Sequence, residues 1–379
     1  MTHYLDNAAT TPVCAEAVQA AVTAMDEQWG NPSARYALGG EVSALLAQWR
    51  QDVADGLGCA AGEVFFTSCG TESNNWAIQA AAELGRRRGK HIITTAIEHA
   101  AVLEPCRALE RQGYEVTYLH PDRQGNIALP ELVGALREDT VLVSMMLVNN
   151  ELGTCLPVAE AARAIKQAGC GALLHCDAVQ GFLKVPFSPK ELGVDLLSVS
   201  GHKVYAPKGI GALYVRRGLK LGPLLLGGGQ EGGLRSGTEP TAQIAAFAAA
   251  VRAGMATLEA DLARMAELKG YAAHCLTREV AGLRVLVEGA APHILPVAMP
   301  GYKSEVVVRF LSDKGIFVSS GSACHKGKPS HVYRALNLPK KEQDGVLRIS
   351  FSHQSDRQDV DALVCGLKLA GEQLFQTLS

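Results

Sequence analysis

Residues 198–209 read Ser-Val-Ser-Gly-His-Lys-Val-Tyr-Ala-Pro-Lys-Gly, and apolar runs precede and follow this stretch. Lys203 therefore stands between two turn sequences, Ser-Gly-His and Pro-Lys-Gly, with strand-like residues on both sides. A lysine held in a partly desolvated pocket loses some of its charge and becomes nucleophilic, so Lys203 is a candidate for binding an aldehyde cofactor as a Schiff base. Taken alone, the stretch favours a solvated lysine in a hairpin over a Schiff-base lysine. Other segments of the chain are needed to choose between these two interpretations.

The composition is that of an ordinary globular protein. Of the 379 residues, 47% are hydrophobic and 20% are charged, which predicts two domains, or one large domain with an appendage. A formal net charge of -2 creates no global field that attracts nucleic acid or an anionic membrane. The chain begins without a basic and then apolar segment and has no run of about 20 apolar residues, so we expect a cytoplasmic protein without membrane partners. Ten cysteines without a Cys-x-x-Cys pair indicate reduced thiols.

Strand and helix patterns alternate through the first two thirds of the chain. Strands are predicted at 63–67, 91–95, 115–119, 141–148, 172–176, 195–199 and 210–215. Helices are predicted at 13–29, 40–56, from Gly70 onward, and at 101–112, 130–137, 158–168 and 240–268. This alternation predicts an α/β fold with a mostly parallel sheet, helices on both faces, and ligands at the carboxyl ends of the strands. A smaller α+β domain is expected from residue 259 to the end.

Three features fall at predicted strand ends. Gly70 and Thr71 open a helix whose free N–H groups can bind a phosphate, although a simple helix cap explains them as well. Asp177 ends an apolar strand, where a carboxylate can keep a pyridine nitrogen protonated. A metal site at His175, Cys176 and Asp177 is less favoured, because adjacent strand residues point to opposite faces. His99 can stack on a flat cofactor, but a lone histidine there is more often structural.

Seven segments in the same order along the chain resemble one family. They are residues 4–12 (Tyr-Leu-Asp-Asn-Ala-Ala-Thr-Thr-Pro), 71–75 (Thr-Glu-Ser-Asn-Asn), 148–151 (Val-Asn-Asn-Glu), 175–180 (His-Cys-Asp-Ala-Val-Gln), 200–203 (Ser-Gly-His-Lys), 235–238 (Arg-Ser-Gly-Thr) and 319–324 (Ser-Ser-Gly-Ser-Ala-Cys). Together they resemble the cysteine desulfurases of the NifS/IscS type, pyridoxal-phosphate enzymes of the class V aminotransferase group. The resemblance implies a fold-type I transferase with a seven-stranded type of sheet in the large domain.

The resemblance also implies a role for each matched position. Lys203 is the implied Schiff-base lysine, Asp177 the partner of the pyridine nitrogen, and His99 the ring stacked on the cofactor. Gln180 binds the phenolic oxygen of pyridoxal 5'-phosphate, and Asn150 lies near cofactor and substrate. The implied phosphate ligands are Gly70, Thr71, Ser200, His202 and Thr238. Because Thr238 reaches in from a second subunit in this family, a homodimer is expected. The implied domains are a segment 1–12 associated with the small domain, a large domain 13–258, and a small domain 259–379.

The implied reaction removes sulfur from L-cysteine, leaving L-alanine and a persulfide on Cys324. Arg348 is suited to hold the substrate carboxylate, since a guanidinium can bind it with two hydrogen bonds. Cys324 lies in a loop of small and polar residues, and His325, Lys326 and Lys328 follow it. Those cations are expected to lower the pKa of Cys324 by less than about one unit, to dock an acidic acceptor, or only to keep the loop soluble. The acceptor is expected to be a protein such as an iron–sulfur scaffold.

Alternatives remain at this point. An aminotransferase or a selenocysteine lyase of the same family would use the same cofactor residues, and a non-enzymatic sulfur or iron carrier would use the cysteines alone. Departures from the family pattern are Cys69 and Ala206, where glycine is usual, Tyr36, where histidine is frequent, and Cys176, where an aliphatic residue is usual. Of these departures, Cys69 matters most for the predicted phosphate-binding loop, because its Cβ atom restricts the backbone more than glycine does.

Overall fold

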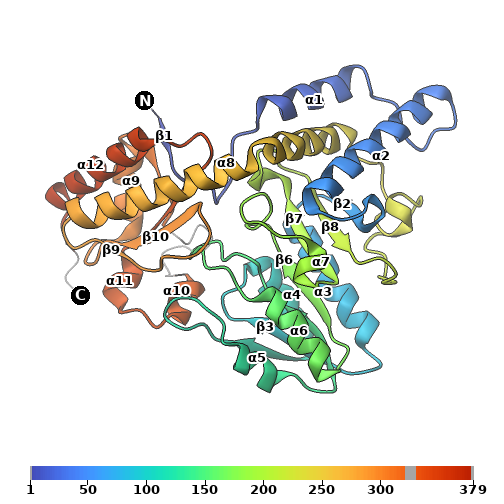
Figure 1. Ribbon diagram of the computed structural model, residues 1–379, viewed down its shortest axis with the longest axis horizontal. Helices are drawn as coiled ribbons and strands as arrows, with labels where there is room; N and C mark the ends of the chain where they lie inside the picture. Colours follow the sequence, from blue (N-terminus) through green and yellow to red (C-terminus); the bar gives the residue numbers. More distant parts are fainter. Residues whose placement is uncertain (1, 321–329, 377–379) are drawn as a thin grey trace.

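A seven-stranded sheet organises the computed structural model, which describes residues 2–320 and 330–376 (Figure 1). Across the sheet the strands are β2 (Val64–Thr67), β8 (Gly211–Val215), β7 (Leu196–Ser200), β6 (Leu173–Asp177), β5 (Thr140–Ser144), β3 (His91–Thr95) and β4 (Glu115–Leu119). Strands β7, β6, β5, β3 and β4 are parallel, whereas β8 is antiparallel to both of its neighbours. The mainly parallel sheet is confirmed, and Lys203 lies in the connection between antiparallel strands.

Both faces of this sheet are buried, which explains the continuous apolar runs in its strands. Alternate residues point to opposite sides, so Ile92 and Leu196 pack on one face while Ile93 and Leu197 pack on the other. Helices α3 (Gly70–Gly85) and α4 (Ala100–Glu110) cover the first face. The second face is covered by α2 (Ala37–Leu57), α5 (Leu129–Ala135), α6 (Val158–Ala168) and the first part of α8 (Thr241–Glu279).

Two predicted bounds differ from the structure by more than three residues. The strand predicted at 141–148 ends at Ser144, although Met145 and Leu147 still donate backbone hydrogen bonds to β6. The helix predicted at 240–268 continues to Glu279, because its second part packs into a separate core. Local apolar periodicity could not show that one helix serves two cores.

The second core is built around a small antiparallel sheet of order β12-β10-β9. Its strands are β9 (Arg284–Val285), β10 (Ile294–Ala298) and β12 (Val346–Ser350), and its helices are α9 (Ser304–Ser312), α12 (Arg357–Gln373) and the second part of α8. Leu5 is buried in this core, next to a two-stranded sheet of β1 (His3–Tyr4) and β11 (Ile316–Phe317). Shorter helices are α7 (Pro189–Leu192), α10 (His331–Ala335) and α11 (Lys340–Asp344). Figure 1 shows α8 running from one core to the other.

Helix α8 is also the one helix of the described chain that is long and apolar enough to cross a membrane by length and composition. Its residues 244–251 are buried against the large sheet instead. Helix α1 (Ala15–Asp26) packs along α8 and, as Figure 1 shows, lies at the outer edge of the molecule. The apolar character of α8 is therefore explained by packing inside the protein.

Candidate active site

A cavity of about 500 Å³ opens at the carboxyl ends of the parallel strands. Ten of the residues that the sequence nominated line it: Gly70, Thr71, His99, Asn150, Asp177, Gln180, Ser200, His202, Lys203 and Arg348. They come from strand ends, loops, the start of α3 and the middle of β12, up to 278 positions apart (348 minus 70). Thr238 does not line the cavity and is exposed, and Cys324 with its cationic neighbours lies outside the described residues.

One end of the cavity is formed by the N-terminus of α3. A Cβ atom at Gly70 would stand 2.7 Å from Cγ2 of Val179, so only glycine fits between this helix and the neighbouring loop. The hydroxyl of Ser200 is buried nearby and has no hydrogen-bond partner in the described part of the chain. Cys69, the departure of most concern, has φ of -177°, an extended conformation that any residue adopts. The helix N-terminus and the free hydroxyl together suit a phosphate group.

Asp177 is the last residue of β6, and two donors hold its carboxylate. Asn74 Nδ2 donates to Oδ2 at 2.7 Å, and the backbone N–H of Val179 donates to Oδ1 at 3.0 Å. Asn74 was not singled out from the sequence, although it stands one helical turn after Thr71 in a motif that was. These two donors fix the orientation of the Asp177 carboxylate at the end of its strand.

His99 forms the N-cap of α4. Its Nδ1 accepts a hydrogen bond from the backbone N–H of Ala101 at 3.1 Å, which leaves the ring proton on Nε2. Burial lowers the pKa of His99 from its usual value, and nearby Lys203 lowers it further. A neutral, fixed imidazole can lie flat against an aromatic cofactor without adding charge to the site.

Lys203 points toward two backbone carbonyl groups. Its Nζ donates to the oxygen of Ala8 at 2.7 Å and to that of Ala9 at 2.6 Å. Burial lowers the pKa of Lys203 to about 8, and the charge of Arg348 adds to this effect. Since a neutral amine has two hydrogens and one lone pair, the two carbonyl groups occupy both hydrogens and leave the lone pair free. The predicted nucleophile and base is thus oriented by the N-terminal segment.

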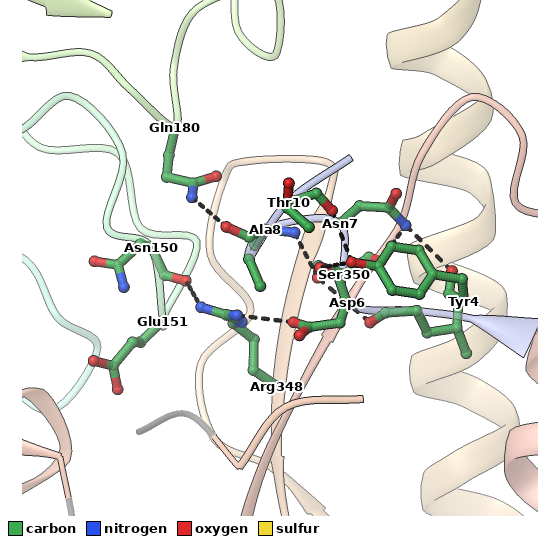
Figure 2. Close-up of polar contacts among 12 residues, drawn as sticks. Tyr4, Asp6, Asn7, Ala8, Thr10, Asn150, Glu151, Gln180, Arg348 and Ser350 are labelled. Carbon is green, nitrogen blue, oxygen red and sulfur yellow. Dashed lines mark hydrogen bonds and ion pairs between the residues drawn. The ribbon is translucent and has the colours of Figure 1, made fainter. Parts of the chain in front are cut away.

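That N-terminal segment, residues 5–11, contributes more to the site than the sequence indicated. Gln180 Nε2 donates to the oxygen of Ala8 at 2.8 Å, as Figure 2 shows. Thr10 Oγ1 lies 3.2 Å from Nδ1 of His202. Burial lowers the pKa of that histidine to about 4, so its ring is neutral at physiological pH. In the sequence, this segment was indicated only by the family resemblance of residues 4–12.

Arg348 projects from β12 into the cavity and is almost completely buried. Nη1 donates to the backbone oxygen of Asn150 at 2.9 Å and Nη2 donates to Asp6 Oδ1 at 2.8 Å (Figure 2). Nε is buried and has no hydrogen-bond partner among the residues that the structure describes. An unused donor on a fixed guanidinium is what a substrate carboxylate requires.

Two buried carboxyl groups near the cavity were not anticipated. Burial raises the pKa of Glu98 to about 8, and the charge of Asp177 adds to the rise. Burial raises the pKa of Glu151 to about 7, and one of its oxygens accepts from Ser330 at 2.8 Å. Both residues are adjacent to predicted ones, His99 and Asn150, yet adjacency alone did not distinguish them. His175, considered above for a metal, is buried between the hydroxyl groups of Ser144 and Ser198.

The residues present fit pyridoxal 5'-phosphate. The N-terminus of α3 and the Ser200 hydroxyl suit its phosphate, and the carboxylate of Asp177 suits a protonated ring nitrogen. Lys203 is the amine that an aldehyde requires. These three groups line one cavity, which decides against a merely solvated hairpin lysine.

Comparisons with known proteins agree with this geometry. A family model described as aminotransferase class-V matches residues 3–363. The chain is 39% identical over 364 residues to cysteine desulfurase IscS of Dictyoglomus turgidum, covering 94% of this chain and 91% of that protein. It is 40% identical over 371 residues to cysteine desulfurase IscS of Methanosarcina thermophila, covering 95% and 90%. Among solved structures, a NifS-like protein matches with a TM-score of 0.93 and 36% identity, over 99% of this chain and 100% of that chain. A structure of SspA in complex with cysteine matches with a TM-score of 0.81 and 34% identity, over 94% and 100%.

Proposed function

This chain belongs to the class V aminotransferase family, and from that premise we propose that it is a cysteine desulfurase. One observation carries the proposal: Lys203, Asp177 and the free donor of Arg348 meet in a single cavity. The named relatives are cysteine desulfurases, and one similar solved structure holds cysteine. L-Cysteine is therefore the substrate, and L-alanine is the organic product.

Each described residue has a task in this reaction. Pyridoxal 5'-phosphate, when bound, supplies an aldehyde for the amino group and a ring that withdraws electrons from the substrate. Asp177 holds a proton on the ring nitrogen, and Gly70, Thr71, Ser200 and His202 bind the phosphate. Arg348 binds the substrate carboxylate. Lys203, neutral above a pH of about 8 and oriented by Ala8 and Ala9, removes the α-proton and returns it.

Cys324 is proposed to receive the sulfur atom, on the basis of its sequence alone. Its thiolate attacks the sulfur of cysteine, so that an S–S bond forms and the C–S bond breaks. The electron pair of the broken bond stays with the carbon skeleton, which takes up protons and becomes alanine. Thiol and cysteine thus give persulfide and alanine, and no separate oxidant is needed. An acceptor protein, such as an iron–sulfur scaffold, then takes the sulfur.

We propose further that the active form is a homodimer in the cytoplasm. Helix α1 exposes an apolar stripe of Val18, Val22 and Met25, at spacings of four and three residues, and the exposed Trp29 follows three residues after the helix ends at Asp26. Such a stripe on the outer edge of a protein favours burial against another surface. Thr238 is exposed and is not among the described residues that line this chain's own cavity, which fits a residue that serves the partner's phosphate.

The proposal is tested with the purified protein, L-cysteine and a thiol reductant. We expect equal amounts of alanine and sulfide, an absorbance band near 400 nm, and loss of both the band and the turnover in Lys203→Ala. Cys324→Ser should keep the band and lose sulfur transfer. Formation of an oxo acid instead of alanine would replace the desulfurase by an aminotransferase.

A further inference from the structure

The carboxylate of Asp6 lies on the side of Arg348 that faces away from the cavity. Their closest oxygen and nitrogen are 2.8 Å apart, with side-chain exposures of 21% for Asp6 and 6% for Arg348. Arg348 lines the cavity, whereas Asp6 does not. The carboxylate of Asp6 contacts the site through its ion pair with the guanidinium group, as Figure 2 shows, and its charge also acts on the cavity at longer range.

The backbone holds Asp6 in this place. Residue 6 forms a parallel bridge to Ser350 on β12, the strand that carries Arg348. The backbone oxygen of Leu5 accepts a hydrogen bond from the backbone N–H of Ser350 at 2.7 Å, and Asn7 Nδ2 donates to the backbone oxygen of Ser350 at 3.0 Å. The Tyr4 hydroxyl donates to the backbone oxygen of Asp6 at 3.2 Å. The acid and the arginine thus belong to one rigid unit, so that a bound carboxylate does not displace the acid from the arginine.

We propose that Asp6 is a charge-balancing and positioning residue that limits how tightly Arg348 holds a carboxylate. Asp6 fixes one terminal nitrogen of the guanidinium and Asn150 the other, which leaves the Nε–H as the nitrogen without a hydrogen-bond partner among the described residues. At the same time, the negative charge of Asp6 cancels much of the positive potential that Arg348 presents to the cavity. The pair orients a carboxylate by hydrogen bonding and attracts it only weakly by charge.

This inference rests on the proposed function, in which substrate and product carry the same carboxylate. An anchor that binds both tightly lowers KM without raising kcat, and it delays release of alanine. A partly neutralised anchor keeps the orientation and allows release. Asp6 also raises the pKa of Lys203, whereas Arg348 lowers it, so the negative charge of Asp6 offsets the positive charge of Arg348 at the lysine.

The test measures binding of propionate, a carboxylate with neither an amino group nor a thiol, to the cofactor-loaded protein by ligand-observed NMR. We expect Asp6→Asn to tighten propionate binding by about tenfold, because the repelling charge is gone. The effect should shrink as salt rises, since the interaction is electrostatic. With L-cysteine, alanine should then inhibit Asp6→Asn at lower concentration than the parent protein. Propionate binding does not depend on sulfur chemistry, so it still reports on Asp6 if the chain proves to have another activity.

Two variants separate charge from geometry. Asp6→Glu keeps the charge but moves the carboxylate, so propionate affinity should stay within about threefold of the parent protein. Asp359→Asn makes the same chemical change at the contact with His3, beyond reach of Arg348, and should change nothing. Weaker or unchanged binding in Asp6→Asn would overturn the proposal. If Asp6→Asn does not fold, Asp6→Glu decides alone: a large loss of affinity there shows that Asp6 acts by geometry and rejects charge balance.

Discussion

At the scale of single residues, this site is governed by burial of ionisable groups that have few opposite charges beside them. The pKa of Lys203 falls to about 8, while that of Glu98 rises to about 8. Both shifts arise mainly from removal of water, which disfavours the charged form of either group. Such perturbed groups cluster at functional sites; here Lys203 lines the cavity, and Glu98 precedes the lining residue His99. The site is thus tuned by its depth in the protein more than by ion pairs.

Asp177→Asn isolates the charge of one residue. The amide keeps the shape of the side chain and can still accept from Val179, so cofactor binding should persist. It does not hold a proton on a ring nitrogen as a carboxylate does, and turnover should fall on the order of 100-fold or more. Cofactor content is read from absorbance and turnover from alanine release. Turnover near that of the parent protein would refute the role given to Asp177.

Glu98→Gln tests whether that acid is neutral in the folded protein. The folded-state pKa of about 8 lies above the usual 4.5, so between these values the native state holds a proton that the unfolded chain releases. The contribution of Glu98 to the free energy of unfolding is therefore fully present below pH 4.5, and it is lost as pH rises through about 8. We expect thermal unfolding curves of the parent protein to lose Tm over this range, and those of Glu98→Gln to lose less.

The control for that experiment is Glu104→Gln, which removes an exposed carboxylate from the neighbouring helix α4. Its Tm should follow the same pH dependence as the parent protein. Parallel curves for the parent protein and Glu98→Gln would mean that Glu98 is ionised when folded.

At the scale of elements, two segments bring the cavity together. Helix α3 presents its N-terminus to the cavity, while the segment of residues 5–11 joins β12 to the loop that carries Lys203. The backbone carbonyl groups of that segment serve Lys203 and Gln180, so its contribution depends on the path of the chain rather than on its side chains. The backbone of α3 at Gly70 likewise lies close to its neighbours, here the side chains of Val179 and Ser200.

Gly70→Ala should disturb the phosphate end of the cavity. The added methyl group would meet Val179 at 2.7 Å, so α3 must move, at a cost of about 1–3 kcal/mol. We expect cofactor affinity, measured by titration of the cofactor-free protein, to fall by roughly tenfold or more.

The matched control is Gly134→Ala, in the exposed helix α5, where an added Cβ meets nothing within 4 Å. It should leave cofactor affinity unchanged and stabilise the protein by up to about 1 kcal/mol, since alanine is the better helix former. Equal cofactor affinities in the two variants would show that the close approach at Gly70 is irrelevant to binding.

At the scale of the whole molecule, the long helix α8 joins the core that carries Lys203 to the core that carries Arg348. The cofactor residues and the substrate anchor therefore come from different cores and meet between them. An apolar stripe remains on the outer side of α1, where the proposed dimer would bury it.

Val22→Arg should dissociate that dimer. Val22 is 47% exposed in the single chain, so a charge there is tolerated by the monomer but opposed in an apolar interface. We expect sedimentation analysis to show monomers, with turnover reduced because Thr238 no longer reaches a partner. Leu84→Arg, at a similarly exposed apolar residue of α3, is the control and should leave the assembly intact. A dimer that survives Val22→Arg would place the interface elsewhere.

The sequence by itself determined the class of fold, the alternation of strands and helices, and ten of the residues that line the cavity. These features were readable because strand ends, helix starts and turn residues are local, and because each motif carries its chemistry within a few positions. Lys203, Asp177 and Arg348 were named on that basis, and the structure brings all three together.

Only the tertiary structure decided how that site is supported. The contacts of Asp6 with Arg348 and of the Ala8 carbonyl group with Lys203 join residues 342 and 195 positions apart, and no local pattern encodes such pairs. Likewise, the raised pKa of Glu98 and Glu151 follows from burial that several elements produce jointly. Burial and long-range contacts belong to the packed chain, and for that reason the charge balance at Arg348 could be recognised only in the folded molecule.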